Sequence, residues 1–505
     1  MQIGDRATME NKAEALRRLS QDALTDLSAA VSRPAYDRNL VSIGVVHFGP
    51  GVFHRAHQAF YLDRILAWDP RWGICGVSLR SSSMQVALKP QDWLYTLAVL
   101  GEPTTFQVIG SLKEVLVAPH QQAEVMSRLV ASTTRVVSIT VTEKGYCTDR
   151  DGNLDTGRAE IAHDLRNPHS PESLVGWLVE GLRLRRAAGL APFTVISCDN
   201  LIDNGARLRR AAIQFAEETD NNLARWIEDK AAFPRTMVDS IAPATDETLR
   251  ADVRSALGLE DAWPVQRELF AQWVIEDVPG ASGPDWAAIG VTVTRNISAF
   301  DRAKLKLLNT AHSTLAYVGI LLGYESTAEA MHDDSLAEFI RALMLDDIVP
   351  TLRPTYEFDL PNYVQTILDR VRNPAIHHKL MQIAQDGSQK LPPRLFETLQ
   401  MAMTGGRRID RLAVPIAAWM RFACRQVLGG EEIVDPAGKQ IKEAARACAS
   451  KTDGDVSRFL ALRTIFPADL AADRRFIQAV THAFDILGPL GSGGTRRFPK
   501  WSEVS

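Results

Sequence analysis

The feature that most constrains the fold is a change in hydrophobic pattern near residue 296. Before it, short apolar runs rich in β-branched residues alternate with longer stretches of helical periodicity. After it, helical periodicity dominates, as in "RAKLKLLNTAHSTLAYVGILLGY" (302–324) and "PIAAWMRFACRQVLG" (415–429). Strands that alternate with helices predict a parallel sheet with helices on both faces. We therefore expect an α/β domain over residues 1–296 and a mostly α-helical domain over residues 297–505.

Seven runs in the first part have the composition of strands. They are residues 43–49, 73–79, 135–142, 193–199, 236–242, 270–277 and 289–294. No convincing strand follows them. A chain of 505 residues also exceeds what a single hydrophobic core usually serves, which agrees with two domains.

Charge and cysteine usage narrow the class of partner. The formal net charge is −4, with acids and bases interspersed, so neither a nucleic-acid footprint nor a polybasic membrane patch stands out. Small-molecule partners are favoured. Cys75, Cys147, Cys198, Cys424 and Cys448 occur singly, which argues against a zinc ribbon and a disulfide framework. With no signal-peptide core and no long apolar run, we expect a soluble cytoplasmic protein that does not bind membranes.

One stretch, "VVHFGPGVFHRAHQAF" (45–60), runs from a buried strand through a glycine-rich turn into a helix start. Such a turn points backbone N–H groups at the place where a dinucleotide pyrophosphate binds. Gly49 and Gly51 match the first two glycines of G-x-G-x-x-G, whereas His54 stands at the third. A helix N-terminus with polar caps is the simpler alternative. A metal site at His54 and His57 is disfavoured, because no cysteine or acidic residue nearby supplies further ligands.

A second stretch, "SCDNLIDNG" (197–205), follows a buried strand. It places Asp199, Asn200 and Asn204 at the carboxyl end of that strand, the edge at which open α/β sheets bind ligands. Taken alone, an asparagine-rich loop is more often a turn than a site.

A third stretch, "KLKLLNTAHS" (304–313), carries Lys304, Asn309 and His312 on one expected helix. Positions 304, 308 and 312 fall on one stripe of an α-helix, and 309 with 312 forms an i, i+3 pair, so the three polar groups can converge. Their neighbours are apolar. A polar cluster in an apolar helix needs partners, and a substrate could be one of them.

Several long motifs in one order now point to a family. The chain resembles the polyol-specific long-chain dehydrogenase/reductase family, which includes mannitol 2-dehydrogenases and D-mannonate oxidoreductases (fructuronate reductases). The motifs are "VVHFGPGVFHRAHQAFYLDRIL", "VTEKGY", "SCDNLIDNG", "FPRTMVDSIAP", "FAQWVIED", "KLKLLNTAHS" and "QIAQDGSQKLPPR". The resemblance implies a Rossmann-type first domain, a helical second domain, a nicotinamide cofactor, no catalytic metal, and a monomer.

The resemblance also implies residue roles. Lys304 matches the catalytic lysine, Asn200 and Asn309 match the oxyanion-hole asparagines, and His312 matches a substrate-contacting histidine. Asp239 and Lys390 match positions that contact substrate hydroxyl or terminal groups. The cofactor-binding positions are then Gly49, Gly51, Val52, Phe53, Arg80 and Glu143. Glu143 and Asp301 are candidates for a proton relay to water, though either could equally be a surface acid.

These roles fit the chemistry of alcohol oxidation. The reaction needs a base for the hydroxyl proton, donors for the developing alkoxide, and a hydride acceptor held against the carbinol carbon. A lysine amine can be that base if burial lowers its pKa from about 10.4 toward neutrality.

The chain departs from the family pattern after the second expected strand. The acidic residue that usually grips the adenosine ribose is missing from "GVSLRSSSMQ" (76–85), where Arg80 and several serines stand instead. An arginine among hydroxyls could accept a 2′-phosphate, which leaves NADP open. We favour NAD because most of the family uses it.

The substrate prediction rests on "HHKLMQIAQDGSQKLPPR" (377–394). Mannitol-type members tend to carry an arginine where this chain has Gln382, and the string resembles the mannonate branch. A sugar-acid carboxylate could meet Lys390, with Arg394 or Arg235 as bidentate partners. We therefore favour reversible reduction of D-fructuronate to D-mannonate over interconversion of D-mannitol and D-fructose. Gln382 could also merely cap or pack its segment. A non-catalytic dinucleotide-sensing regulator is the alternative from another class.

Overall fold

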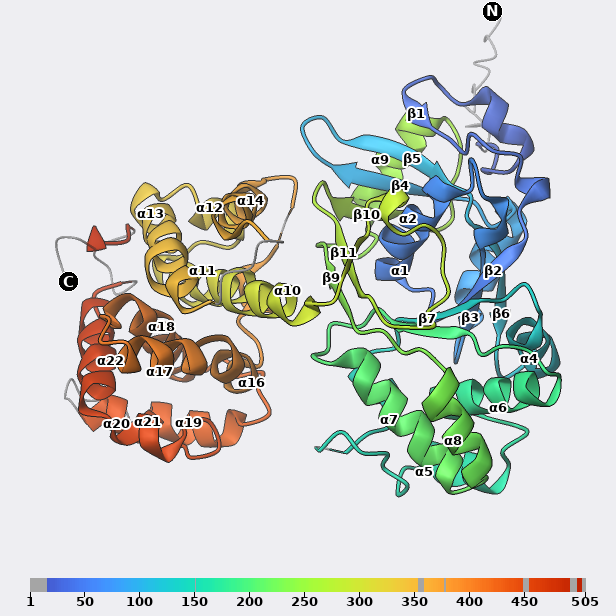
Figure 1. Ribbon diagram of the computed structural model, residues 1–505. Coiled ribbons are helices and arrows are strands. Elements are labelled where there is room, and N and C mark those ends of the chain that lie inside the picture. Colours follow the sequence, from blue (N-terminus) through green and yellow to red (C-terminus); the bar gives the residue numbers. More distant parts are fainter. Residues whose placement is uncertain are drawn as a thin grey trace, which may run out of the picture. The chain divides into compact units, whose positions relative to one another are not determined.

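The computed structural model describes residues 16–149, 151–352, 358–376, 378–447, 454–490 and 497–501. The chain forms two compact units, Met1–Arg295 and Asn296–Ser505 (Figure 1). Cys75, Cys147, Cys198 and Cys424 are buried and form no disulfide, and Cys448 lies outside the described residues.

The first unit is built on a five-stranded, fully parallel sheet, which confirms the predicted Rossmann-type fold. In spatial order its strands are β6 (Leu112–Val117), β3 (Gly73–Ser78), β2 (Ile43–Phe48), β7 (Val136–Ile139) and β8 (Thr194–Ser197). Phe48 at the end of β2 pairs with Val77 of β3 and Ile139 of β7. The carboxyl ends of the three central strands therefore meet at one edge.

Two smaller sheets complete this unit, and here the expectation of one parallel sheet was too simple. One contains β1 (Val31–Ser32), β5 (Thr105–Ile109), β4 (Tyr95–Leu100) and β10 (Val265–Glu268), and the other contains β12 (Thr292–Thr294), β11 (Gln272–Glu276) and β9 (Thr236–Asp239). Strands β4 and β5 are antiparallel, as are β9 and β11. The last three expected strands, β9, β11 and β12, thus form a separate sheet and do not join the main one. Strands β9 and β11 are antiparallel, and such neighbours need no helical crossover.

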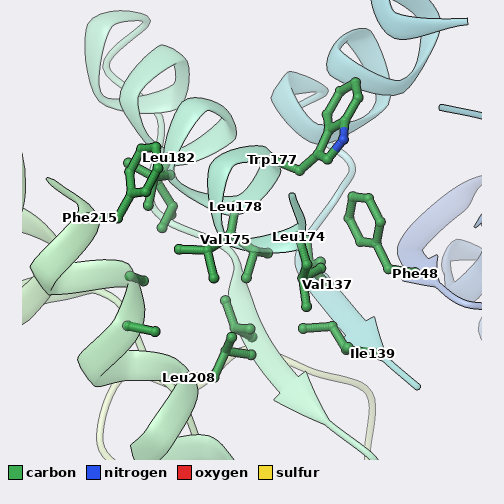
Figure 2. Close-up of a cluster of buried hydrophobic side chains, with 14 of the residues drawn as sticks. Phe48, Val137, Ile139, Leu174, Val175, Trp177, Leu178, Leu182, Leu208 and Phe215 are labelled. Carbon is green, nitrogen blue, oxygen red and sulfur yellow. The ribbon is translucent and has the colours of Figure 1, made fainter. Parts of the chain in front are cut away.

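Helices α6 (Leu174–Ala187) and α7 (Asn204–Glu217) pack on the main sheet through a large apolar cluster (Figure 2). Trp177 of α6 meets Phe48 of β2, with 6.4 Å between ring centroids. Leu178 and Leu208, from the two helices, are also fully buried in this cluster. Each such side chain contributes about 1.5–3 kcal/mol to stability on burial. This packing fixes the strand ends that carry the loops of the candidate site.

Shorter helices fill the rest of the unit. They are α1 (Val52–Ala56), α2 (Gln58–Ile65), α3 (Ser83–Leu88), α4 (Gln122–Val130), α5 (Ala159–Arg166), α8 (Asn221–Lys230) and α9 (Glu247–Leu257).

The second unit is mostly helical in its described residues, as predicted. Its helices are α10 (Ile297–Ala303), α11 (Asn309–Leu322), α12 (Thr327–Ala330), α13 (Asp334–Ala342), α14 (Leu360–Arg372), α15 (Leu380–Ile383), α16 (Gly387–Leu391), α17 (Glu397–Thr404), α18 (Asp410–Leu428), α19 (Gly438–Arg446), α20 (Gly454–Leu460), α21 (Ala468–Ala472) and α22 (Arg474–Ile486). Helix α11 is apolar almost all round and packs against α15 and α18, as a central core helix does. Among the described helices, none combines the length and apolar character needed to cross a membrane.

Within the described part of this unit, three segments are π-helical. They are Lys304–Leu308, Leu343–Ile348 and Pro392–Phe396. The first overlaps the motif "KLKLLNTAHS", and the third overlaps "QIAQDGSQKLPPR". π-turns are frequent at functional sites.

Candidate active site

A cavity of the first unit opens at the carboxyl ends of β2, β3 and β7, where a Rossmann fold binds its dinucleotide. Its lining residues are Gly49, Pro50, Gly51, Ser78, Leu79, Arg80, Ser81, Ser83, Met84, Thr140, Val141, Thr142, Lys144, Gly145, Arg158 and Trp263. The structure therefore brings Gly49 and Gly51 together with Arg80, which follows Gly49 by 31 residues in the sequence.

The two glycines of the turn have different physical reasons to be glycine. Gly49 has φ +85°, and a Cβ built on it would lie 2.2 Å from the carbonyl oxygen of Thr140. The fold itself therefore excludes a side chain there. Gly51 has an ordinary φ of −71°, and a Cβ on it would meet nothing closer than 3.8 Å. Gly51 thus leaves space that a ligand can use.

His54, at the third motif position, is fully buried and stacks on His47 of β2, with ring centroids 3.4 Å apart. This stacking replaces the close helix–strand packing that a third glycine would allow. Burial lowers the pKa of His47 to about 3 and holds the pKa of His54 well below its usual value, so both rings are neutral. His57 lies near the backbone carbonyl of Gln272, with 3.0 Å from Nε2 to oxygen. Among the described residues, no group of three potential ligands is placed to hold a metal ion.

Asp199 organises the loop that follows β7. Its carboxylate accepts hydrogen bonds from the backbone N–H groups of Val141 (3.2 Å) and Thr142 (2.9 Å) and from the Tyr146 hydroxyl (3.1 Å). Thr142 has φ +69°, a region that non-glycine residues seldom adopt. Burial raises the pKa of Asp199. We conclude that Asp199 holds this loop in place and that Thr142 and Lys144 line the cavity as a result.

A second cavity adjoins the first and shares Leu79, Arg80, Lys144 and Gly145 with it. One wall is the connection between α5 and α6, including Glu172 and Ser173. Gly145, Cys147 and Trp177 also line this second cavity, so its lining is partly apolar. A partly apolar lining suits an adenine ring.

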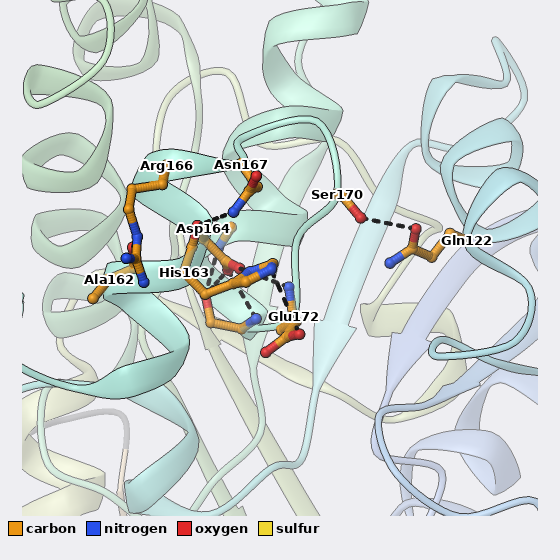
Figure 3. Close-up of polar contacts among 10 residues, drawn as sticks. Gln122, Ala162, His163, Asp164, Arg166, Asn167, Ser170 and Glu172 are labelled. Atoms are coloured by element: carbon orange, nitrogen blue, oxygen red, sulfur yellow. Dashed lines mark hydrogen bonds and ion pairs between the residues drawn. The ribbon is translucent and has the colours of Figure 1, made fainter.

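The buried carboxylate of Asp164 holds the connection between α5 and α6 in place by hydrogen bonds (Figure 3). Its carboxylate accepts the backbone N–H groups of Glu172 and Ser173, each at 2.8 Å, and the Ser173 hydroxyl at 2.6 Å. Ser170 donates to Gln122 of α4 at 3.1 Å, which ties the connection to the opposite side of the cavity. Polar residues far apart in sequence thus build the wall, so sequence patterns gave no sign of it.

The remaining cofactor positions lie beside these cavities without lining them. Val52 and Phe53 are half-buried on α1, where Phe53 stacks on His57 with centroids 5.0 Å apart. Glu143 is exposed at the start of a short 3₁₀ turn. Asn204 has a structural role, since its amide donates to the carbonyls of Asp199 (3.1 Å) and Thr236 (3.0 Å).

In the second unit, Lys304, Asn309 and His312 lie on one helical run, but that run is not a uniform α-helix. Residues 304–308 form a π-turn, and the N–H of Asn309 donates to the carbonyl of Lys304 five residues earlier. In an α-helix, residues five apart lie about 140° apart around the axis. The wider turn brings Lys304 toward the face of Asn309. The predicted stripe of 304, 308 and 312 assumed a regular α-helix throughout, and the π-turn changes only its first step; Asn309 and His312 keep their i, i+3 relation within α11.

A second π-turn, Pro392–Phe396, is fastened to the first. Lys306 is almost fully buried, and its Nζ donates to the carbonyl of Pro393 (2.8 Å) and pairs with Glu397 (3.0 Å). Arg394 donates to the carbonyl of Asn309 (2.9 Å) and to the hydroxyl of Ser313 (2.6 Å). The helix that carries Lys304 is thus held directly by the segment that follows Lys390.

Cationic and imidazole groups gather around this junction. Burial lowers the pKa of Arg394 to about 10. Burial, followed by the charge of Arg394, lowers the pKa of Lys390, whose Nζ donates to the carbonyl of Ile383 at 3.2 Å. Burial and then Lys390 lower the pKa of His378, whose ring lies edge-on to that of His312 with centroids 5.3 Å apart. Each of these groups would gain from a nearby anion.

Other predicted residues lie elsewhere. Gln382 is exposed and lines a separate cavity with Phe422, a cavity that does not include Lys390 among its lining residues. Arg235 is paired with Asp203 (3.0 Å) and Glu276 (2.6 Å), so its charge is already compensated within the first unit.

The three remaining predicted residues lie on different elements. Asn200 is exposed after β8. Asp239 is buried as the last residue of β9, and Asp301 is half-buried on α10.

Comparisons with known proteins agree with this architecture. The family model for the mannitol dehydrogenase Rossmann domain matches residues 43–288, and that for the mannitol dehydrogenase C-terminal domain matches residues 296–487. A D-mannonate oxidoreductase of Escherichia coli (strain K12) is 40% identical over 480 residues, covering 93% of this chain and 98% of the relative. A mannitol 2-dehydrogenase of Aspergillus fumigatus is 35% identical over 499 residues, covering 96% and 98%.

A solved structure is also similar. The mannitol 2-dehydrogenase of Pseudomonas fluorescens, in a ternary complex with NAD and D-mannitol, has a TM-score of 0.79 and 36% sequence identity. The match covers 94% of this chain and 97% of that chain.

Proposed function

The chain belongs to the mannitol dehydrogenase family, and we propose that it is an NAD-dependent oxidoreductase that interconverts D-mannonate and D-fructuronate. The observation that carries this proposal is the cluster around the two π-turns. There Lys304, Asn309 and His312 share one helical run, to which Arg394 is hydrogen-bonded through Asn309 and Ser313, and Lys390 lies four residues before Arg394. The NAD assignment is supported by the cofactor of the Pseudomonas fluorescens structure and by the space at Gly51.

Unit 1 supplies the cofactor site in this proposal. The glycine turn would leave room at Gly51 for the pyrophosphate, and the second cavity would receive the adenine. When bound, the nicotinamide supplies a hydride acceptor or donor. Val52 and Phe53 follow the turn directly on α1, and we assign Glu143, at the start of the 3₁₀ turn after β7, to the same cofactor site.

Lys304 acts as the general base in the oxidative direction. Its neutral amine takes the hydroxyl proton of the substrate as the C–H bond gives up its hydride, and it returns that proton in the reductive direction. The side chains of Asn200 and Asn309 donate to the developing alkoxide without adding charge. His312 orients the substrate, and Asp239 accepts from a substrate hydroxyl.

The choice of a sugar acid rests on Lys390 and Arg394. Both are cations whose pKa burial lowers, so a carboxylate placed beside them would recover part of the lost solvation. A neutral polyol offers no such compensation. Gln382 is too exposed to carry this choice. We therefore assign the carboxylate end of the substrate to Lys390, with Arg394 supporting it.

The substrate assignment is tested by kcat/KM for D-mannonate and D-mannitol under one set of conditions, following the absorbance of reduced cofactor. We expect a clear preference for D-mannonate. We also expect Lys390→Met to lower kcat/KM for D-mannonate about 10- to 100-fold and to change the value for D-mannitol far less. Lys379→Met, on an exposed neighbouring position, serves as the matched control. A preference for D-mannitol would overturn the sugar-acid assignment, and no turnover of any polyol or sugar acid would favour a dinucleotide-sensing regulator.

A further inference from the structure

The adenosine end of the cofactor cavity lacks the group that selects NAD. In Rossmann folds that use NAD, a carboxylate after the second strand of the motif accepts hydrogen bonds from the ribose 2′-hydroxyl and repels a phosphate there. Here β3 ends at Ser78, and residues 79–83 contain no acidic side chain. This position therefore does not reject a 2′-phosphate.

Arg80 lies two residues after the end of β3, beside the position that lacks the acid. It is exposed, it lines both cavities at their junction, and it has no ion-pair partner among the described residues within 4.0 Å. Two neighbouring hydroxyls line the same cavity: Ser81 and Ser83, whose Oγ atoms are 2.7 Å apart. A guanidinium with adjacent hydroxyl donors is a favourable environment for a phosphate.

The other charged groups of the two cavities do not cancel Arg80. Arg158 and Glu160 pair with each other at 2.5 Å and so neutralise one another. Glu172 lies 3.7 Å from a ring nitrogen of His163, on the far wall. Lys144, which like Arg80 lines both cavities, adds a further positive charge. The junction of the two cavities therefore favours an anion.

From this arrangement we propose that Arg80, with Ser81 and Ser83, forms a binding site for the 2′-phosphate of NADP(H), so that the protein uses NADP(H) as well as NAD(H). The inference rests on the proposed function, because it concerns the adenosine end of the same cofactor cavity. Fork-like recognition by a guanidinium gives hydrogen bonds that a 2′-hydroxyl cannot match, and hydrogen bonds to charged groups contribute about 1.5–3 kcal/mol each.

Calorimetry with two nucleotide fragments tests the site without turnover. Adenosine 2′,5′-bisphosphate and 5′-AMP differ only in the 2′-phosphate. We expect the full-length protein to bind the bisphosphate about 10- to 100-fold more tightly than 5′-AMP. In Arg80→Ala this ratio should fall to near one. Lys89→Ala removes an exposed cation just beyond α3 that lines neither cavity, and it should keep the wild-type ratio.

Steady-state kinetics then separates this inference from the function on which it rests. We expect wild-type kcat/KM values for NADP⁺ and NAD⁺ within about tenfold of each other, and a selective loss for NADP⁺ in Arg80→Ala. Equal binding of the two fragments, or an unchanged ratio in Arg80→Ala, would overturn the 2′-phosphate site while turnover with NAD⁺ keeps the proposed function. Binding of neither fragment would overturn both.

Discussion

The two units carry their candidate functional residues by opposite means. In the first unit, backbone groups at the ends of parallel strands form the cavity, and the decisive residues are glycines that keep side chains away. In the second unit, the chemistry lies in side chains on a helical run that a π-turn distorts. The cavity of the first unit depends on the order of its parallel strands. The arrangement in the second unit depends on the π-turn and on the contacts that hold this turn in place.

This difference predicts how each half tolerates change. A strand-end cavity should lose cofactor affinity when its space is filled and should keep its fold. In the second unit, turnover should fall when the contacts that hold the π-turn are removed. The extra residue in the turn is retained only while surrounding contacts support it. The variants below separate these two behaviours.

The largest effect is expected from Lys304→Ala. Removing the amine should lower kcat about 10²- to 10⁴-fold, because general acid–base catalysis contributes that much, while NAD affinity stays nearly unchanged. Stopped-flow turnover and titration of NAD against protein fluorescence measure the two quantities. Near wild-type turnover would remove Lys304 from the mechanism, and a large loss of NAD affinity would show that the two halves are not separable.

Gly49 and Gly51 provide a paired test of the first half. Gly51→Val should fold normally and weaken NAD binding by about 1–3 kcal/mol, roughly 10- to 100-fold, because the side chain enters the space left for the ligand. Gly49→Val should instead fail at folding, because its Cβ would meet the Thr140 carbonyl. Thermal denaturation and calorimetry distinguish the outcomes. Equal effects of the two variants on folding would contradict the division of roles.

The buried histidines make the first unit sensitive to acid. The pKa of His47 is about 3 in the folded state and near 6.5 when unfolded, so the unfolded state binds more protons as the pH falls from about 6.5 to 3. Stability is therefore complete above pH 6.5 and decreases below it, by about 2 kcal/mol at pH 5. Urea unfolding at pH 7.5 and 5 should show a smaller decrease in His47→Asn.

Comparing variant with wild type isolates His47 from other titrating groups. One of these is Asp63, whose pKa burial raises to about 6. An identical pH dependence in both proteins would contradict the assignment.

The smallest effect concerns the fastening of the π-turn. Lys306→Met should cost about 1–2 kcal/mol of stability through the lost bond to the Pro393 carbonyl, and it should lower kcat about 3- to 10-fold without changing NAD affinity. Glu397→Gln should do less, since Glu397 is 57% exposed and its ion pair is screened. If Lys306→Met lowers stability but leaves kcat unchanged, the π-turn does not depend on this fastening.

The first half was largely readable from the sequence. Short apolar, β-branched runs and the Gly-Pro-Gly turn predicted β2, β3, β7 and β8 and the edge at which they end, and the structure confirmed the Rossmann-type fold. Strands β1, β4, β5, β6 and β10 were missed. Strands β4 and β5 are an antiparallel pair with no helix between them, and β6 carries the charged Lys113 and Glu114 in a short run. Thr142 and Lys144 could have been found, since they belong to the motif "VTEKGY" that was noted only for its acid.

In the second unit the residues could be read from the composition, but the π-turn that carries them could not. The residues Lys304, Asn309 and His312 stood out because polar groups are costly on an apolar helix. Their stripe was drawn for a regular α-helix, and a π-turn has no sequence signature of its own. The turn is in contact with a segment far along the chain, since Lys306 donates to the carbonyl of Pro393, 87 residues away, and no local pattern encodes such a contact.

The most direct test of the central claim, that the amine of Lys304 carries the proton, is rescue of Lys304→Ala by small primary amines. With saturating NAD and D-mannonate, we expect turnover to rise with the concentration of free methylamine and to increase with pH as that amine loses its proton. The same amine should not raise the turnover of Gly51→Val. Absence of rescue by any small amine, together with substantial residual turnover in Lys304→Ala, would contradict the account.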